Sequence, residues 1–244
     1  MMTLTSTNQQ LKEGISLHPD GWLDVQSTFK TIQGEGPFTG VPAIFVRLAG
    51  CNFQCPGCDT DYTSTRRVMS PGAIMEDALE KTVGTAINLL VLTGGEPFRQ
   101  DIAKFIHMAS LVFHVQIETN GSLYQPIGIC PITGRLANSN ISIICSPKSP
   151  KIHPELAHKV SSYKYVLQHG RISKKDGLPT NSILGEDSPP AYRPIGLAKT
   201  SIYVQPLDEG DPDKNNKNVQ ACIDSCTKFG YRLSIQTHKI IGLE

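Results

Sequence analysis

The sequence predicts an α/β fold: a single-domain partial (β/α) barrel with its active site at the carboxyl ends of the strands. Short apolar runs alternate with amphipathic segments along the chain, which is the pattern of parallel strands joined by helices. Polar motifs follow directly after several of these runs, where barrels of this kind place their active sites. The chain has 244 residues, and 39% of them are hydrophobic, so its length and composition suit one domain of this class.

Seven apolar runs are predicted to form strands. The first barrel-type strand is expected at Ala43 to Leu48, and the closing strand at Arg232 to Ile235. The intervening strands are expected at 88–92, 115–117, 141–145, 163–167 and 201–204. Amphipathic spacing predicts helices at 72–82, between 100 and 113, and at 219–229.

Five polar motifs stand at the ends of these expected strands. The first strand is followed by a cysteine-rich stretch at 51–58, and the second by Thr93-Gly-Gly-Glu-Pro97. The expected strands at 115–117, 141–145 and 201–204 are followed by Glu118-Thr-Asn-Gly121, Ser146-Pro-Lys148 and Gln205-Pro-Leu-Asp208, respectively. Because active sites of such barrels lie at the carboxyl ends of the strands, we expect these motifs to belong to one site.

Two regions interrupt the alternation. Residues 1–20 are predicted to be a disordered tail, which leaves 21–244 as the core domain. Residues 170–199 are rich in Gly, Pro, Ser and Asp, which predicts a loop-rich insertion rather than a helix. That insertion is either a lid or a surface loop, and a surface loop is favoured because long loops are only sometimes functional.

Charge and hydropathy narrow the class of partner. The formal net charge is +1, which supplies no basic field of the kind that dominates nucleic-acid binding. No apolar run approaches the roughly 20 residues of a membrane span. Residues 1–12 are polar and lack the apolar core of an export signal, so a reducing, cytoplasmic setting is expected. A small-molecule substrate is favoured, with neither nucleic acid nor membrane as a partner.

Three cysteines in the stretch Cys51-Asn-Phe-Gln-Cys55-Pro-Gly-Cys58 are the most informative feature of the chain. Their spacing can direct three thiolates to one iron-sulfur cluster. Most clusters have four cysteine ligands, so a set of three leaves one iron open to an exchangeable ligand. A zinc site completed by a histidine, or a disulfide with one spare thiol, remains possible on the spacing alone. The cluster is favoured, and an open coordination position indicates an enzyme.

The surroundings of the cysteines carry a family resemblance. Phe29-Lys-Thr-Ile-Gln33-Gly-Glu35-Gly lies upstream, Phe45-Val-Arg47-Leu-Ala-Gly-Cys51 leads in, and Cys58-Asp-Thr60 leads out. Together they resemble the radical S-adenosylmethionine (SAM) enzymes and, more narrowly, the 7-carboxy-7-deazaguanine synthase family, over about residues 23–244. A glycyl-radical activating enzyme shares the cysteine spacing but is not expected to carry Gln33-Gly-Glu-Gly36 or the Cys58-Asp-Thr60 ending. A non-enzymatic zinc module is the less favoured alternative.

The resemblance implies a radical SAM type of partial barrel and a set of cofactors: a 4Fe-4S cluster, SAM and Mg²⁺. The implied reaction belongs to queuosine and 7-deazapurine biosynthesis. A radical derived from SAM removes hydrogen from C6 of 6-carboxy-5,6,7,8-tetrahydropterin, and the ring contracts to 7-carboxy-7-deazaguanine with loss of ammonia. The resemblance also implies an electron donor such as flavodoxin, and a homodimer.

All of these motifs except Glu118-Thr-Asn-Gly121 receive a role from this resemblance, although a bare strand-to-helix turn would explain several of them equally well. The implied cluster ligands are Cys51, Cys55 and Cys58. The implied SAM-binding residues are Gly57, Cys58, Asp59, Gly95, Glu96, Ser146, Pro147, Lys148, Gln205, Pro206, Leu207 and Asp208. The implied substrate-binding residues are Ile32, Gln33, Gly34, Arg47, Thr93, His238 and Glu244.

Elementary chemistry agrees with several of these roles. Glycines let the backbone approach a ligand closely, and the Glu96 carboxylate can accept hydrogen bonds from an ammonium group. The Arg47 guanidinium can pair with a substrate carboxylate through two hydrogen bonds, although it can also be a surface arginine. The Thr60 hydroxyl is a hard oxygen ligand suited to Mg²⁺, to which the resemblance assigns it, but it could equally cap a turn.

The remaining cysteines receive no role in the site. Cys222 and Cys226 are four residues apart on an expected helix, so they face one side of it. They could bind a metal, but a core position is favoured because buried thiols are common. Cys130 and Cys145 are expected in the core or in a loop.

Overall fold

The computed structural model describes residues 8–127, 140–182, 184–185, 187–196 and 201–243. Within these residues, nine strands form one sheet in the order β3-β1-β2-β4-β5-β6-β7-β8-β9. The strands are β1 (Leu23–Ile32), β2 (Pro42–Leu48), β3 (Arg67–Met69), β4 (Leu89–Gly94), β5 (His114–Thr119), β6 (Ile141–Cys145), β7 (Ser162–Leu167), β8 (Ile202–Pro206) and β9 (Arg232–Leu233). The α-helices are α1 (Pro71–Thr82), α2 (Ala103–Ser110), α3 (Pro154–Ala157), α4 (Pro212–Phe229) and α5 (Thr237–Ile240).

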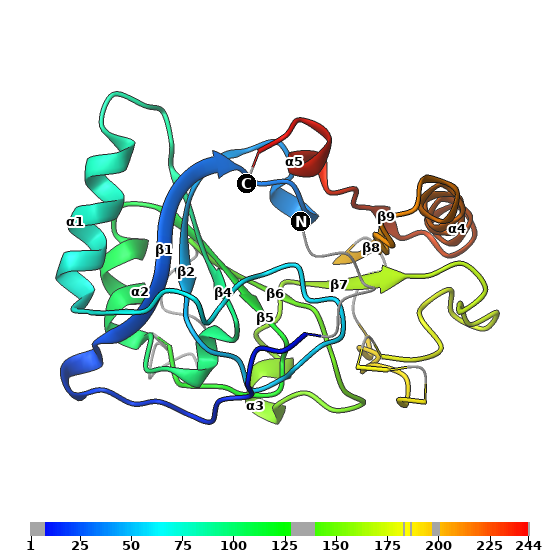
Figure 1. Cartoon of the computed structure of the whole chain (residues 1–244), viewed down its shortest axis with the longest axis horizontal. Helices are drawn as coiled ribbons and strands as arrows, with labels where there is room; N and C mark the ends of the chain where they lie inside the picture. Colours follow the sequence, from blue (N-terminus) through cyan, green and yellow to red (C-terminus); the bar gives the residue numbers. More distant parts are fainter. Residues whose placement is uncertain (1–7, 128–139, 183, 186, 197–200, 244) are drawn as a thin grey trace.

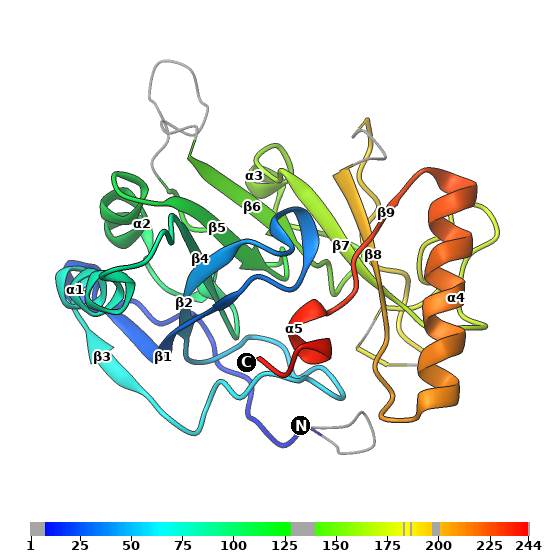
Figure 2. The same cartoon turned by 90° about the horizontal axis from the view of Figure 1, so that it is seen from above.

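The sheet is an open arc, as a partial barrel requires (Figure 1). From β2 to β9 the neighbouring strands are all parallel, whereas β1 pairs antiparallel with both β2 and β3. Figure 2 shows α1, α2 and α3 along the outer side of the arc and α4 beyond β8, with α5 on the inner side. The predicted fold class is therefore confirmed, and each of the seven expected strands is present within a few residues of its predicted bounds.

Two strands were missed by the sequence prediction. β1 contains Gln26, Ser27, Thr28 and Lys30, and all but its first three residues are half-buried or exposed. It therefore has no continuous apolar run. β3 has three residues and lies at the edge of the sheet. Edge and antiparallel strands need only one buried face, so their sequences carry a weaker signal than the buried parallel strands.

The start of α4 also differs from the prediction. The helix begins at Pro212, seven residues before the expected start at Val219, because the polar residues of its first turns hide the apolar period. Its start is nevertheless marked chemically, since the Asp211 side chain accepts hydrogen bonds from the backbone of Asp213 and Lys214. Gly230, in the left-handed conformation, ends it.

Alternation along the strands separates the core from the inner face. On β2, Ile44, Val46 and Leu48 are buried in the main apolar core under the outer helices, which contact the sheet from that side. Phe45 and Arg47 point to the opposite face. Toward the amino ends of the strands, that inner face is filled by a small apolar group around Leu89. At the carboxyl ends of the strands, the inner face of the sheet is open to a cavity.

Residues 8–20, which belong to the predicted disordered tail, make specific contacts with the rest of the fold. Asn8 is buried, with only 4% of its surface exposed, and it hydrogen-bonds across the chain to Tyr62. Glu13 and Ser16 donate backbone hydrogen bonds to Cys51 and Arg99. Residues 1–7 lie outside the described part. A polar segment can pack against a loop when it satisfies the polar groups of that loop.

The predicted loop-rich insertion at 170–199 contains no helix or strand among its described residues. Isolated pairing joins Ile172 to Pro179, and Arg193 bridges to Asp176 and to the carbonyl of Pro179. This packing supports the surface-loop interpretation but leaves the choice between lid and loop as a prediction. Among the described helices, none has the length and apolar character needed to cross a membrane.

Candidate active site

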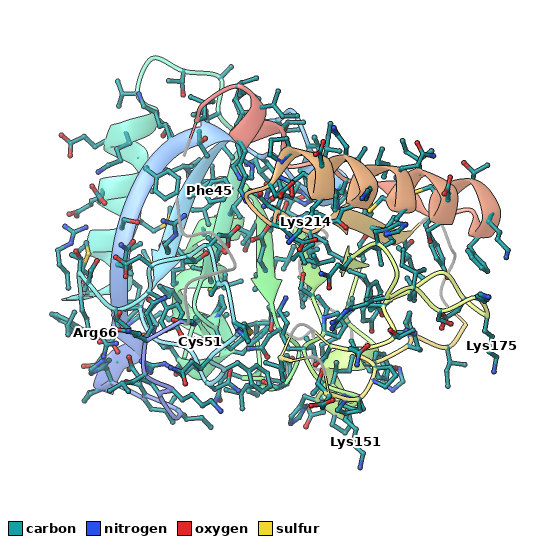
Figure 3. The ribbon with its side chains drawn as sticks, turned by 45° about the vertical axis from the view of Figure 1, so that its right-hand side comes forward. Phe45, Cys51, Arg66, Lys151, Lys175 and Lys214 are labelled. Atoms are coloured by element: carbon teal, nitrogen blue, oxygen red, sulfur yellow. The ribbon has the colours of Figure 1, made fainter. Side chains whose placement is uncertain are left out.

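A cavity of about 660 Å³ opens on the inner face of the sheet, at the carboxyl ends of the parallel strands. Figure 3 shows Cys51 beyond the carboxyl end of β2, with Phe45 farther back along the same strand. Both residues line the cavity. Fifteen of the residues that the sequence assigns to ligands also line it: Ile32, Gln33, Gly34, Arg47, Cys51, Cys55, Cys58, Asp59, Thr60, Thr93, Gly95, Ser146, Lys148, Asp208 and His238.

Other predicted ligand residues lie outside the cavity wall. These are Gly57, Glu96, Pro147, Gln205, Pro206 and Leu207. Leu207 lines a separate, smaller cavity instead, next to Pro56 of the cysteine loop. Glu244, the remaining predicted substrate residue, lies outside the described residues.

The three cysteines of the loop are free thiols. Cys51 is buried, while Cys55 and Cys58 are half-buried, and all three line the same cavity. Burial raises the pKa of each thiol, that of Cys51 to about 12, and the neighbouring thiolates add to this effect at Cys51. Among the described residues, no three ligating side chains already have the spacing of ligands to one ion. The donor set nevertheless fits an iron-sulfur cluster, because soft thiolates from one short loop are the ligands that such clusters take.

The glycines after β4 allow this strand to end directly against the cysteine loop. A Cβ atom on Gly95 would lie 2.0 Å from the carbonyl oxygen of Gly50, which is closer than any real contact. Instead, Gly95 donates its backbone N–H to the carbonyl of Leu48, and Glu96 donates to Gly50. The close backbone approach predicted for these glycines is therefore present, but it is made to the protein's own chain at the start of the cysteine loop.

Glu96 behaves as a structural carboxyl. It is fully buried, and its side chain accepts hydrogen bonds from the backbone of Phe98 and Asn120 and from the Thr119 hydroxyl. Burial raises its pKa to about 7, against the opposing effect of these donors. The carboxyl therefore ties β4 to the end of β5 and does not face the cavity, which differs from its predicted role beside an ammonium group.

Asn52 and Asn120 connect the cysteine loop to the same end of β5. The Asn120 side chain donates to Asn52 Oδ1 at 2.9 Å, and Asn52 donates to the Ser122 hydroxyl at 2.8 Å. Asn120 also lines the cavity. Asn120 belongs to the motif Glu118-Thr-Asn-Gly121, which received no role from the sequence.

Glu118 is a cavity residue to which the sequence analysis assigned no role. Its carboxylate accepts hydrogen bonds from Gln33 Nε2 at 3.2 Å and from the Thr93 hydroxyl at 3.0 Å, so it joins two predicted substrate residues. Gln116, two residues earlier on β5, donates to it as well. Its position at the carboxyl end of an expected strand was the available signal.

Glu35 and Lys164 form a buried ion pair on the cavity wall. Glu35 also accepts hydrogen bonds from Gln205 at 3.1 Å and Gln236 at 2.7 Å. Burial alone would raise the pKa of Glu35, but the Lys164 ammonium outweighs it and lowers the pKa to about 2. The amide nitrogen of Gln205 is thus engaged by Glu35. Lys164 lies between two tyrosines on β7, and nothing in the local sequence distinguishes it from a surface residue.

Helix α5, near the C-terminus of the chain, forms part of the cavity wall through His238 and Lys239. A Cβ atom on Gly34 would lie 1.9 Å from Nδ1 of His238, so this position must be glycine for the helix to dock. Thr237 donates its backbone N–H to the Gly34 carbonyl at 3.2 Å. Lys239 bridges Asp59 and Asp208 at 3.5 and 3.4 Å. Three predicted ligand segments from distant parts of the chain therefore meet at α5.

Arg47 and Thr60 lie on the same wall. The Arg47 guanidinium stacks over the Phe29 ring, with 4.9 Å between its central carbon and the ring centroid. The arginine therefore lines the cavity rather than the outer surface. The Thr60 hydroxyl lies 3.5 Å from Asp59 Oδ1, which places a second oxygen beside it.

Comparisons with known proteins agree with this geometry. Residues 46–185 match the family described as the radical SAM superfamily. Proteins named 7-carboxy-7-deazaguanine synthase are similar over most of the chain: that of Rhodospirillum rubrum is 36% identical over 90% of this chain and 92% of its own, and that of Rickettsia prowazekii 35% over 91% and 89%. The crystal structure of QueE from Escherichia coli is similar with a TM-score of 0.65 and 25% identity, covering 88% of this chain and 94% of that one.

These matches favour the radical SAM interpretation over the zinc module, and the synthase family over a glycyl-radical activating enzyme. The family implies a 4Fe-4S cluster and SAM. The chain is a radical SAM lyase that belongs to the 7-carboxy-7-deazaguanine synthase family.

Proposed function

We propose that the protein converts 6-carboxy-5,6,7,8-tetrahydropterin to 7-carboxy-7-deazaguanine, using SAM, a 4Fe-4S cluster and Mg²⁺, with release of ammonia. One observation carries the proposal. The cysteine loop, the Gly95 turn and the Gln33–Gly34 segment all line one cavity of about 660 Å³. A cluster, a nucleoside and a bicyclic substrate must be held side by side for this reaction, and one shared cavity meets that requirement.

At one end of the cavity, the Cys51, Cys55 and Cys58 thiolates would hold the cluster. When bound, the cluster and SAM supply the one-electron chemistry that generates a 5'-deoxyadenosyl radical. Lys148 lies close enough to lower the pKa of the Cys55 and Cys58 thiols, in opposition to burial, and so favours their thiolate forms. Its ammonium is also suited to the carboxylate of SAM.

At the other end, the chain would position the substrate. Arg47, held by stacking on Phe29, would pair with the substrate carboxylate, and the Gln33–Gly34 backbone would read the edge of the pterin ring. Glu118 would accept a ring N–H, because its carboxylate stands between Gln33 and Thr93. Packing by α5 around His238 would exclude water from this end.

Thr60 would supply an oxygen ligand to Mg²⁺, which keeps several waters and takes few protein ligands. Asp59 supports this role, because its carboxylate is adjacent to the Thr60 hydroxyl. Six of the predicted SAM residues do not line the cavity, and four of these would act on SAM binding indirectly. Glu96 and Gln205 are engaged by internal hydrogen bonds, and Pro147 and Pro206 would shape the strand ends.

The remaining parts of the proposal rest on the family resemblance. They are reduction of the cluster by an electron donor such as flavodoxin, assembly as a homodimer, and a cytoplasmic location. A reducing setting is consistent with three free thiols that must remain unoxidised to bind iron.

Mass spectrometry of an anaerobic reaction tests the activity. The reconstituted protein is incubated with SAM, a reductant, Mg²⁺ and 6-carboxy-5,6,7,8-tetrahydropterin, and 7-carboxy-7-deazaguanine is the expected product. Formation of 5'-deoxyadenosine without this product would contradict the assigned substrate, and a colourless protein with stoichiometric zinc would contradict the cluster.

A pair of variants tests the proposed Mg²⁺ ligand. Thr60→Val should reduce turnover and weaken the dependence of turnover on Mg²⁺. Thr60→Ser, which keeps the hydroxyl, should retain both.

A further inference from the structure

Residues 8–16, here called the N-terminal strap, lie along the outside of the cysteine loop. The strap precedes the region that matches the radical SAM superfamily, which begins at residue 46. Lys12 pairs with Cys51 as an isolated parallel bridge, and Glu13 donates its backbone N–H to the Cys51 carbonyl at 2.7 Å. The strap thus contacts the loop directly at a predicted cluster ligand.

Two side chains of the strap hold the rest of the loop. Asn8 donates to the carbonyl of Cys55 at 3.1 Å and to the Tyr62 hydroxyl at 3.3 Å. Gln10 donates to the carbonyl of Thr60 at 2.9 Å and accepts from the backbone N–H of Tyr62 at 2.7 Å. The strap therefore satisfies backbone groups at the start of the loop (Cys51), in its middle (Cys55) and just beyond its end (Thr60 and Tyr62).

The strap is itself anchored to a buried charge cluster. Glu13 accepts hydrogen bonds from Arg66 and, at 2.7 Å, from Arg99, whose side chain is only 1% exposed. Arg99 also faces Asp24 at 3.5 Å and packs against Gly50, the residue before the first cysteine. The ion pairs of Glu13 therefore hold the strap in place, and the strap can in turn restrict the conformation of the loop.

The cysteine loop needs such support. Between β2 and β3 the chain contains no helix and no strand longer than a single bridge, so its conformation depends on hydrogen bonds from elsewhere. Groups that orient the ligands of a metal site typically change metal affinity by a factor of 10 to 100, even without touching the metal.

We propose that the N-terminal strap is a positioning element for the cluster: Asn8 and Gln10 hold the loop in its ligand-bearing conformation and slow the release of iron. This inference rests on the proposed function, because it requires a cluster at Cys51, Cys55 and Cys58. It assigns no chemical step to the strap.

The experiment compares Asn8→Ala and Gln10→Ala with Gln9→Ala in the full chain. Gln9 lies between the two residues and is exposed, so it is a matched control. After anaerobic reconstitution, iron release to a chelator is followed through the absorbance of the cluster. Asn8→Ala and Gln10→Ala should release iron on the order of tenfold faster than the wild type and Gln9→Ala. The electron paramagnetic resonance spectrum of their reduced cluster should also change.

Thermal unfolding of the metal-free proteins completes the test. Unchanged unfolding temperatures together with faster release would support the strap as a positioning element. Equal release rates in cluster-bearing proteins would overturn it, and so would faster release that merely follows a comparable loss of stability in the metal-free protein. A wild type that binds no cluster would overturn the proposed function and this inference with it.

Discussion

The two ends of the cavity are built in different ways. At the cluster end, the three thiols come from one loop of eight residues, 51–58. At the substrate end, Glu35 meets Lys164 from 129 residues away and Gln236 from 201 residues away. A local motif therefore supplies the cluster end, whereas only the folded chain assembles the substrate end. This difference explains why all three cysteines that line the cavity could be predicted from the sequence, whereas Glu35, Glu118 and Lys164 received no role from it.

The two ends also differ in how they treat a buried carboxyl group. Glu96, behind the cluster end, is surrounded by neutral hydrogen-bond donors, and burial raises its pKa to about 7. Glu35, at the substrate end, faces Lys164, which lowers its pKa to about 2 despite burial. Burial therefore sets the direction of the pKa shift at Glu96, which has no ion partner among the described residues, and is outweighed at Glu35 by the Lys164 ammonium.

The largest expected effect breaks the cluster end alone. Cys55→Ser should remove a cluster ligand and abolish both iron incorporation and formation of 5'-deoxyadenosine. Cys226→Ser is the control, because Cys226 is a half-buried free thiol on α4, away from the cavity wall. Iron and sulfide analysis measures the result. A Cys55→Ser protein that retains a full cluster would contradict the assignment of this loop.

The second effect breaks the substrate end. Glu35→Gln leaves the Lys164 ammonium without its ion partner, and both side chains are less than 15% exposed. Removal of one member of such a pair typically costs about 3–5 kcal/mol. Urea unfolding of the metal-free protein measures the loss, and the double variant Glu35→Gln, Lys164→Met should recover most of it. A single-variant loss below about 1 kcal/mol would show that solvent screens the pair.

A third, smaller effect separates the two carboxyls by pH. The pKa of Glu96 lies above its ordinary value of 4.5, so the folded state binds the extra proton and stability falls as pH rises from 4.5 to about 7. The pKa of Glu35 lies below that value, so its contribution is present above pH 4.5 and is lost as pH falls toward about 2. The measurement is the free energy of unfolding of Glu96→Gln and Glu35→Gln across both pH ranges. Glu96→Gln should reduce the pH dependence only between pH 4.5 and about 7, and Glu35→Gln only between pH 4.5 and about 2.

The smallest effect concerns the bridge between the two ends. Lys239 contacts Asp59 and Asp208, but these carboxylate side chains are 54% and 35% exposed. Because solvent screens exposed pairs, Lys239→Met should change the free energy of unfolding by less than about 1 kcal/mol. Chemical denaturation measures it, with Lys214→Met on the exposed part of α4 as the control. A larger loss at Lys239 would show that the two ends are coupled in stability.

Much of the fold was predictable because parallel strands are buried on both faces. The run at 141–145 matches β6 at both ends, and the run at 43–48 matches β2 within one residue. β1 and the polar first turns of α4 were missed because each shows only one apolar face or none. The contacts of residues 8–20 could not be predicted because they are hydrogen bonds to a distant loop, which leave no apolar period in the sequence.

The sequence by itself determined the family, the cysteine loop and the positions along the chain of the parallel strands and of the motifs that follow them. These features are local, since each depends on residue spacing within a few turns of chain. Only the tertiary structure decided which side chains face the cavity. It directed Glu96 and Gln205 to internal hydrogen bonds, placed Glu118 between Gln33 and Thr93, and docked α5 on Gly34. Those outcomes depend on which distant donors and charges meet in space, and no short stretch of sequence records that.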